Sequence, residues 1–295
     1  MAEASAERWR IGFLGPRGTF SEEAARLYAA GRRDPERVEL VASRGIPELL
    51  ASVERGELDQ AVVPAENSIE GTVALTLDTL VHDVRLNIVG EVVIPIRHHL
   101  MVRQGHEREP VHLVVSHPQA LAQCRRYLQR RLGGVEVQAV YSTAEAARLV
   151  GERETPGMAA IANALCAELY GLAIIDSDIQ DVSGNATRFL VVGHGWPART
   201  GLDKTSVAFA FAQDKPGSLY RALGEFAQRE INLTKLESRP AKQFLGDYIF
   251  FADMEGHKDD PAVAAALAGL ERHCAYVRIL GSYPRAEYPR AAANG

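Results

Sequence analysis

Short apolar runs alternate with longer segments in which apolar residues recur every three or four positions. The short runs are bounded by turn residues and predict buried strands, whereas the spacing of three or four predicts helices with one buried face. In the first third of the chain we expect strands at 10–14, 38–42, 61–64 and 86–95, and helices at 21–30, 46–55 and 73–82. Strands that alternate with helices of this length indicate α/β layers.

The same alternation continues in a second block. It predicts strands at 113–115, 135–141, 159–162 and 172–175, with helices at 120–131, from 142 through 150, and up to 170. The later apolar run 189–192 could return the chain to the first block. Two blocks of this kind suggest two lobes around a crevice.

A different order follows the Gly/Pro/His-rich link at 194–197. Apolar alternation predicts strands at 205–213, 231–238, 248–253 and 277–281, and helical spacing covers 218–230 and 261–274. The order strand, helix, two strands, helix, strand is the ferredoxin-like arrangement. With 295 residues, the chain is long enough for two domains. We expect one at 9–195, with lobes 9–93 plus 183–195 and 94–182, and a second at 204–283.

Composition and charge exclude several classes of function. A net charge of −5 and no basic patch with interleaved aromatic residues argue against a nucleic-acid partner. No stretch approaches 18 consecutive apolar residues and the N-terminus has no apolar signal region, so we expect no membrane association. The three widely spaced cysteines fit a reducing cytoplasm, and neither they nor the nine histidines have metal-ligand spacing. We therefore expect a cytoplasmic protein without a metal.

The segment Asn185-Ala186-Thr187-Arg188-Phe189 places an amide, a hydroxyl and a guanidinium at the start of a strand whose apolar sequence predicts that it is buried. Buried polar groups are costly without partners, so this position indicates either a bound ligand or a turn whose side chains bond their own backbone.

Four junctions in the α/β part resemble one another. The segments 15–22, 116–119 and 142–145 open helices with a Thr or Ser followed three residues later by Glu or Gln, and 66–71 lies between a strand and a helix. Exposed N–H groups at such ends can bind anions, although for each junction alone a simple helix cap is the favoured interpretation. Together with 185–189 they favour a cleft that binds carboxylates. Dinucleotide, P-loop and G-x-S-x-G motifs are absent, and no nucleophile–base pair is evident.

Six segments together resemble prephenate dehydratase with a C-terminal ACT domain: 15–25, 64–73, 116–124, 185–189, 237–240 and 255–257. The resemblance runs from about residue 9 to 285. It implies a two-lobed, periplasmic-binding-protein-like α/β catalytic domain followed by a ferredoxin-like ACT domain. It also implies a lyase of phenylalanine biosynthesis that converts prephenate to phenylpyruvate, CO2 and water without a cofactor, and phenylalanine as an effector bound between ACT domains of a homodimer or homotetramer.

The resemblance also implies site residues. Thr187 is the hydroxyl donor at the leaving oxygen, Asn67, Ser116 and Gln123 match positions that contact the substrate, and Ser21, Ser68 and Gln119 are further candidates. Arg188 either binds a carboxylate or braces Thr187, and the bracing role is favoured. Phe189 is expected to pack beneath the site, and Glu66 is either catalytic or a helix cap.

In the C-terminal unit, a helix start and nearby carbonyls could hold a free amino acid. The implied effector residues are Gly217, Ser218, Leu219, Asn232, Leu233, Glu237, Ser238, Arg239 and Pro240. The family's usual Gly-Ala-Leu-Val is here Gly-Ser-Leu-Tyr, and the bulkier Tyr220 leaves the effector open. The segment 237–240 could instead act as a hinge, and the whole unit could serve only for oligomerisation.

Three rival functions stay open on the sequence. Arogenate dehydratase performs the same chemistry on the aminated substrate. A non-catalytic two-lobed protein that binds small acids has a similar fold, and a decarboxylase without dehydration would use a related site. Thr187 and the C-terminal unit favour the dehydratase.

Overall fold

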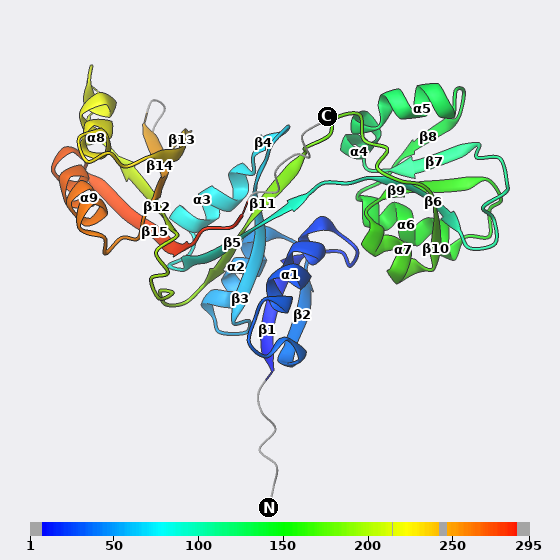
Figure 1. The fold of residues 1–295 in the computed structure, drawn as a ribbon, viewed down its shortest axis with the longest axis horizontal. Coiled ribbons are helices and arrows are strands. Elements are labelled where there is room, and N and C mark those ends of the chain that lie inside the picture. Colours follow the sequence, from blue (N-terminus) through cyan, green and yellow to red (C-terminus); the bar gives the residue numbers. More distant parts are fainter. Residues whose placement is uncertain (1–7, 214, 242–246, 288–295) are drawn as a thin grey trace, which may run out of the picture.

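A computed structural model describes residues 8–213, 215–241 and 247–287. Three bodies lie along the long axis of the molecule (Figure 1). The middle body, which we call lobe I, contains the first elements of the chain and β11. Lobe II, on the right in Figure 1, contains α4 to α7, and the C-terminal unit, on the left, contains α8 and α9. The chain passes between the two lobes after β5 and again before β11.

Lobe I is a sheet with helices on both faces. Its elements are β1 Trp9–Leu14, α1 Phe20–Ala30, β2 Val38–Ser43, α2 Ile46–Glu54, β3 Gln60–Asn67, β4 Gly71–Thr72, α3 Ala74–His82, β5 Asn87–Pro95 and β11 Ala186–Gly193, with a short 3-10 turn at Pro35–Arg37. Strands β2, β1 and β3 are parallel, and β11 lies antiparallel between β3 and β5. As expected, the chain returns to this lobe at β11.

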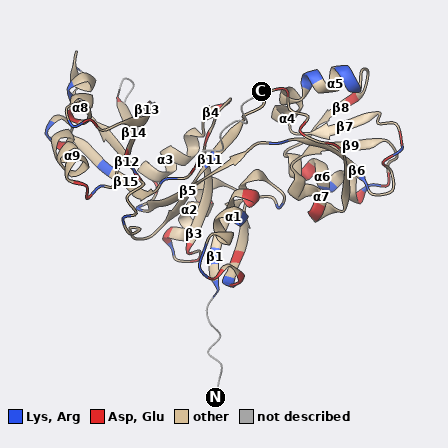
Figure 2. Ribbon diagram, in the orientation of Figure 1, with Lys and Arg blue, Asp and Glu red and all other residues tan. Residues whose placement is uncertain are grey.

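Lobe II has a five-stranded sheet in the order β10-β6-β9-β7-β8. Its elements are β6 His99–Arg103, β7 Leu113–Ser116, α4 Pro118–Gln123, α5 Arg125–Arg131, β8 Glu136–Ala139, α6 Thr143–Glu152, β9 Met158–Ala162, α7 Ala164–Tyr170 and β10 Leu172–Asp176. The sequence pattern did not reveal β6, and the helix expected at 120–131 is two helices that meet at Cys124. Helix α5 carries four arginines, all exposed, and most of its ribbon is blue in Figure 2.

The C-terminal unit has the expected ferredoxin-like order. Its elements are β12 Asp203–Ala210, α8 Ser218–Ala227, β13 Leu233–Pro240, β14 Tyr248–Glu255, α9 Pro261–His273 and β15 Tyr276–Pro284. The strands form the order β13-β14-β12-β15, and α8 and α9 pack on one face of this sheet through a core that includes Phe209, Phe226 and Leu270.

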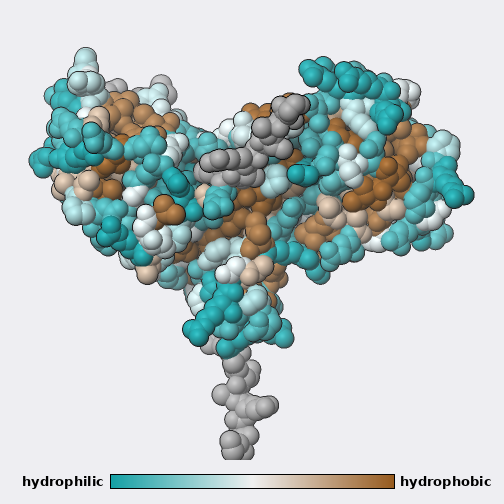
Figure 3. Space-filling model, in the orientation of Figure 1, coloured by the Kyte–Doolittle hydropathy of each residue, from teal (hydrophilic) through white to brown (hydrophobic). Residues whose placement is uncertain are grey.

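The sheets of the C-terminal unit and lobe I are continuous, because β15 pairs with β5 at Gly281 and Ile88. A Cβ atom at Gly281 would lie 2.3 Å from the carbonyl oxygen of Ile88, so only glycine permits this contact. One hydrophobic core contains Leu190 of lobe I together with Phe251 and Tyr283 of the C-terminal unit. Apolar residues are visible in the middle of the molecule and in parts of lobe II and the C-terminal unit, whose outer edges are mostly polar (Figure 3).

Candidate functional site

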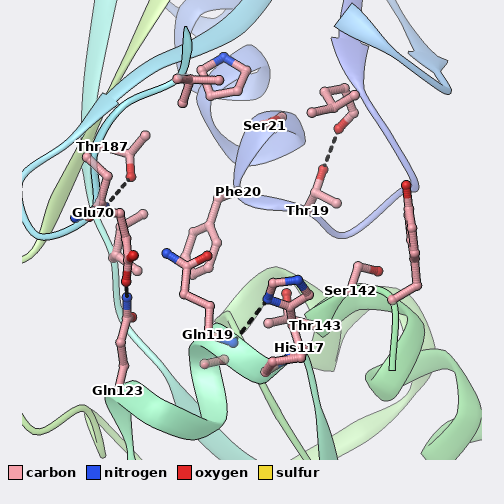
Figure 4. A pocket seen from close by; sticks show the side chains of 18 of the residues that line it. Thr19, Phe20, Ser21, Glu70, His117, Gln119, Gln123, Ser142, Thr143 and Thr187 are labelled. Atoms are coloured by element: carbon pink, nitrogen blue, oxygen red, sulfur yellow. Dashed lines mark hydrogen bonds between the residues drawn. The ribbon is translucent and has the colours of Figure 1, made fainter. Parts of the chain in front are cut away.

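A cavity of about 790 Å³ lies between lobe I and lobe II. Lobe I contributes the start of α1, the β3–β4 hairpin and the start of β11, and lobe II contributes the start of α4 and the loop before α6 (Figure 4). Its polar lining residues are Thr19, Ser21, Arg44, Asn67, Glu70, Thr72, His98, His117, Gln119, Gln123, Tyr141, Ser142, Thr143 and Thr187. Helix starts and short polar side chains thus surround one space large enough for a small organic acid.

Thr187 lies at the wall of the cavity, where β11 begins, and its side chain is largely buried. Asn67, at the end of the neighbouring strand β3, pairs with it across the sheet. The side-chain nitrogen of Asn67 donates a hydrogen bond to the Thr187 hydroxyl oxygen at 2.8 Å, drawn as a dashed line in Figure 4. The same nitrogen donates to the side-chain oxygen of Asn185, also at 2.8 Å.

Two backbone donors fix the orientation of the Asn67 amide. The N–H groups of Ile69 and Glu70 donate to its Oδ1 at 2.9 and 3.0 Å, so Oδ1 must face the hairpin turn and Nδ2 must face Thr187. Because the Thr187 oxygen already accepts this bond, its own hydrogen is available to donate into the cavity. The arrangement makes Thr187 a directed donor.

Gln123 connects the lobes on the same side of the cavity as the Asn67–Thr187 pair (Figure 4), and its Oε1 accepts from the side-chain nitrogen of Asn185 at 3.4 Å. Its Nε2 donates to Glu70 of the β3–β4 hairpin at 3.4 Å, and its Oε1 lies 3.0 Å from Nε2 of His98. His98 is 3% exposed and its ring meets the edge of Phe20. Burial lowers the pKa of His98, so the imidazole is neutral near pH 7.

Two of the predicted helix caps are confirmed and one is wrong. The side-chain oxygens of Thr19 and Ser142 accept from the backbone N–H groups of Glu22 and Glu145. At α4 the cap is His117, whose Nδ1 accepts from Gln119 N. The fourth junction, 66–71, is a hairpin turn between β3 and β4 and does not open a helix directly.

The structure brings five of the expected catalytic and substrate-binding residues to the cavity and leaves three outside it. Thr187, Asn67, Gln123, Ser21 and Gln119 line the cavity, and Phe189 lies beside Thr187 in its wall. Ser116 is fully buried and donates to the carbonyl of Ile161 at 2.6 Å, so it supports β9 and does not face the cavity. Ser68 is exposed and is not among the lining residues; its hydroxyl donates to the side-chain oxygen of Asn185 and accepts from Ala186 N.

Arg188 requires a correction, because it does not face the cavity. Neighbouring residues of a strand point to opposite faces, and Arg188 therefore points away from Thr187 toward the C-terminal unit. Its guanidinium donates to Glu91 at 2.6 Å, to Asp253 at 2.5 Å and to the hydroxyl of Tyr283 at 2.8 Å. Burial by itself raises the pKa of Asp253, but Arg188 and the bond from Ser206 together hold it below its ordinary value. A substrate carboxylate cannot reach this ion cluster, and bracing of β11 is the role that fits.

The expected effector residues divide into two groups. Gly217 starts α8 with φ +83°, Ser218 and Leu219 follow it, the carbonyl of Asn232 accepts from Glu255 N, and Leu233 packs on the core of the unit. In the second group, Glu237 and Arg239 point toward lobe I and bond Thr72 and Asp78, whereas Ser238 and Pro240 are exposed. Contact of any of these residues with phenylalanine stays a prediction.

Sequence reasoning missed four residues of the site. Arg44 is the one lysine or arginine among the described lining residues. Within the described part of the chain, its guanidinium makes no hydrogen bond or ion pair. Glu70, His98 and Asn185 were also missed as site residues, although Asn185 and Glu70 lie in the motifs singled out above. An unpaired arginine after a strand has no sequence signature.

Within residues 8–213, 215–241 and 247–287, no group of three or more His, Cys, Asp or Glu side chains could hold a metal ion. Over the same ranges, no helix is long and apolar enough to cross a bilayer.

Comparisons with known proteins agree on one family. The family model for prephenate dehydratase matches residues 11–196, and that for the ACT domain matches residues 206–272. The prephenate dehydratase of Amycolatopsis methanolica is 43% identical over 281 residues, which cover 94% of this chain and 89% of the relative. The crystal structure of prephenate dehydratase from Arthrobacter aurescens in complex with L-Phe has a TM-score of 0.84 at 37% identity and covers 96% of this chain and 93% of the other. GqqA, described as a novel type of quorum quenching acylase, has a TM-score of 0.83 at 30% identity and covers 94% and 98%.

Proposed function

Because the chain belongs to the prephenate dehydratase family, we propose that it is a phenylalanine-regulated enzyme that converts prephenate to phenylpyruvate, CO2 and water. In class terms it is a carbon–oxygen lyase. The observation that carries the proposal is the Asn67–Thr187 pair, which aims one hydroxyl hydrogen into the cavity between the lobes.

The chemistry needs little more than orientation and one donor. As the bond between the ring and its carboxylate breaks, CO2 leaves and the electron pair enters the ring. The ring carbon–oxygen bond breaks in the same elimination, the ring becomes aromatic, and the oxygen leaves as hydroxide that takes up a proton to form water. Thr187 donates a hydrogen bond to this oxygen as negative charge develops on it. Threonine is too weak an acid to be the source of the proton, so the proton that converts hydroxide to water comes from solvent.

Two kinds of group are available for the two substrate carboxylates. The starts of α1 and α6 present backbone N–H groups at the cavity, and their caps leave neighbouring donors free for an anion. Arg44 adds the positive charge, which an acidic protein has to supply locally. We therefore include Arg44 with Asn67, Gln123, Ser21 and Gln119 among the substrate-binding residues.

The assembly and location of the protein are also part of the proposal. Tyr220, Leu236 and Tyr248 of the C-terminal unit are large apolar residues exposed to solvent, which supports an interface between copies of this unit. We propose a homodimer or homotetramer in the cytoplasm, and light scattering of the purified protein measures its mass.

The direct test is incubation of the purified protein with prephenate and, separately, with arogenate. We expect phenylpyruvate from prephenate, at a rate that changes when phenylalanine is added. Formation of phenylalanine from arogenate at a higher kcat/KM would identify the aminated substrate instead. Because GqqA has a similar fold under another activity, the fold alone does not decide the reaction, and no turnover of either acid would reject the proposal.

A further inference from the structure

Strand β13 of the C-terminal unit presents a row of charged side chains to lobe I. Lys235, Glu237 and Arg239 alternate with residues of the opposite face, as the twofold period of a strand requires. All three are partly buried, and the Lys235 side chain is only 12% exposed. Each has a charged or hydroxyl partner in lobe I, so the row is a built contact between the two bodies.

The partners of Lys235 lie at the base of the β3–β4 hairpin. Its ammonium lies 2.9 Å from the Thr72 hydroxyl and 3.2 Å from a carboxylate oxygen of Glu66. Glu66 and Thr72 face each other across the hairpin, so one ammonium contacts both of its strands. Glu237 completes the contact, because its carboxylate accepts from Thr72 at 2.5 Å and pairs with Lys235 at 3.1 Å.

The next residue pair of the same hairpin is Asn67 with Gly71. Asn67 is the residue whose amide aims the Thr187 hydroxyl, and Gly71 and Thr72 line the cavity. One residue step therefore separates the contact made by Lys235 from the catalytic pair. A second link runs from Arg239 to Asp78 of α3, the helix that follows the hairpin, at 2.8 and 3.1 Å.

We propose that Lys235 is a positioning residue that transmits the state of the ACT unit to the active site, by holding the base of the β3–β4 hairpin against β13. The inference rests on the proposed function. When a ligand of the ACT unit displaces β13, the largely buried ammonium draws Glu66 and Thr72 with it. Asn67 then turns, and the direction of the Thr187 hydroxyl changes. The coupling is reciprocal, so occupancy of the cavity also changes the affinity of the ACT unit for its ligand.

The test compares Lys235→Met with Lys258→Met, which removes an ammonium that pairs with Asp259 inside the C-terminal unit. Coupling between two sites typically changes a response about 5- to 150-fold. We expect Lys235→Met to keep kcat within about threefold of the unaltered protein while the response to saturating phenylalanine falls below about twofold. Lys258→Met should keep the full response, and Lys235→Arg, which preserves the charge, should restore most of it.

Two measurements separate coupling from a loss of folding or of effector binding. Calorimetry should show that Lys235→Met still binds phenylalanine. Hydrogen exchange of residues 66–73 should change when phenylalanine is added to the unaltered protein, and not in Lys235→Met. The inference would be overturned if Lys235→Met kept the full response of its activity to phenylalanine. It would also be overturned if phenylalanine changed the hydrogen exchange of the hairpin in Lys235→Met as much as in the unaltered protein. If the protein does not turn over prephenate, the proposed function fails, whereas the exchange measurement still tests the coupling.

Discussion

The amide nitrogen of Asn67 lies 2.8 Å from the hydroxyl oxygen of Thr187, although 120 residues separate them in the chain. The pairing of β3 with β11 creates this contact, because it sets the last residue of one strand opposite the second residue of the other. Neither residue is a strong acid or base. Their contribution is orientation: the Asn67 amide donates to the hydroxyl oxygen of Thr187, and the hydroxyl hydrogen is then free to donate into the cavity.

Replacement of Thr187 by Ala should remove this donor. We expect kcat to fall by about 10²–10³, as is typical when one transition-state donor is lost, with a smaller change in KM. Thr187→Ser keeps the hydroxyl and should recover much of the rate. Phenylpyruvate formation from prephenate measures both variants, and near-normal turnover by Thr187→Ala would reject the catalytic role.

Asn67→Asp separates the two functions of the Asn67 side chain. Aspartate still accepts from the N–H groups of Ile69 and Glu70, so the hairpin should keep its shape. It cannot donate to Thr187, whose hydroxyl then donates to the new carboxylate and turns away from the cavity. We expect a loss in kcat of about 10²-fold or more, and little further loss in the double variant with Thr187→Ala, because the two residues act as one unit. Losses that multiply in the double variant would contradict this coupling.

Local pattern was enough to predict most strands and helices, because each shows its period over a few residues. Strand β6 was missed because its apolar run, 100–102, is only three residues long and lies between His99 and Arg103. The continuous sheet across β15 and β5 could not be predicted, because the two strands pair at one position only, Gly281 with Ile88, and these residues are far apart in the sequence.

Site residues could be predicted from the sequence where they belong to a recognisable motif. Whether a residue of that motif faces the cavity could not be predicted, because this depends on the direction of its side chain. Thr187 and Asn67 were identified from such motifs, and they meet at the cavity. Ser116 and Arg188 also lie in motifs that carry the resemblance, but a strand sends alternate residues to opposite faces, and these two face away from the cavity. Arg44 belongs to no motif, and only the folded chain brings it to the cavity.

Arg44 provides a prediction about binding as distinct from catalysis. Its charge should attract a doubly anionic substrate without touching the leaving oxygen. We expect Arg44→Gln to raise KM for prephenate by about tenfold, roughly 1.4 kcal/mol, with kcat nearly unchanged. The kcat/KM of the variant should also depend less on salt concentration than that of the unaltered protein. Arg10→Gln is the control and should leave KM unchanged, because Arg10 does not line the cavity and its guanidinium donates to the carbonyl of Glu57. An unchanged KM in Arg44→Gln would exclude the role.

Arg188→Met should mainly affect stability. The change leaves the Asp253 carboxylate buried without its guanidinium and deprives Glu91 of a cationic partner, while its pair with Lys204 remains. Breaking a buried ion pair from one side typically costs about 3–5 kcal/mol in the free energy of unfolding. The matched control Arg97→Met breaks an exposed pair with Asp178 and should cost less than about 1 kcal/mol. Urea unfolding measures both, and equal costs would show that the buried cluster contributes no special stability.

His98 predicts how stability depends on pH. Burial lowers its pKa in the folded protein, with a smaller opposing effect of the bond to Gln123, and the pKa of neighbouring His99 is lowered as well. As pH falls below about 6.5, these histidines become protonated in the unfolded chain while they stay neutral in the folded protein. The folded state therefore loses stability relative to the unfolded state. Each such histidine contributes at most about 1.4 kcal/mol per pH unit. We expect His98→Asn to reduce the slope of unfolding free energy against pH between pH 5.5 and 6.5, because Asn does not titrate. Urea unfolding at several pH values measures the slope, and a slope equal to that of the unaltered protein would mean that His98 is protonated as readily in the folded state as in the unfolded chain.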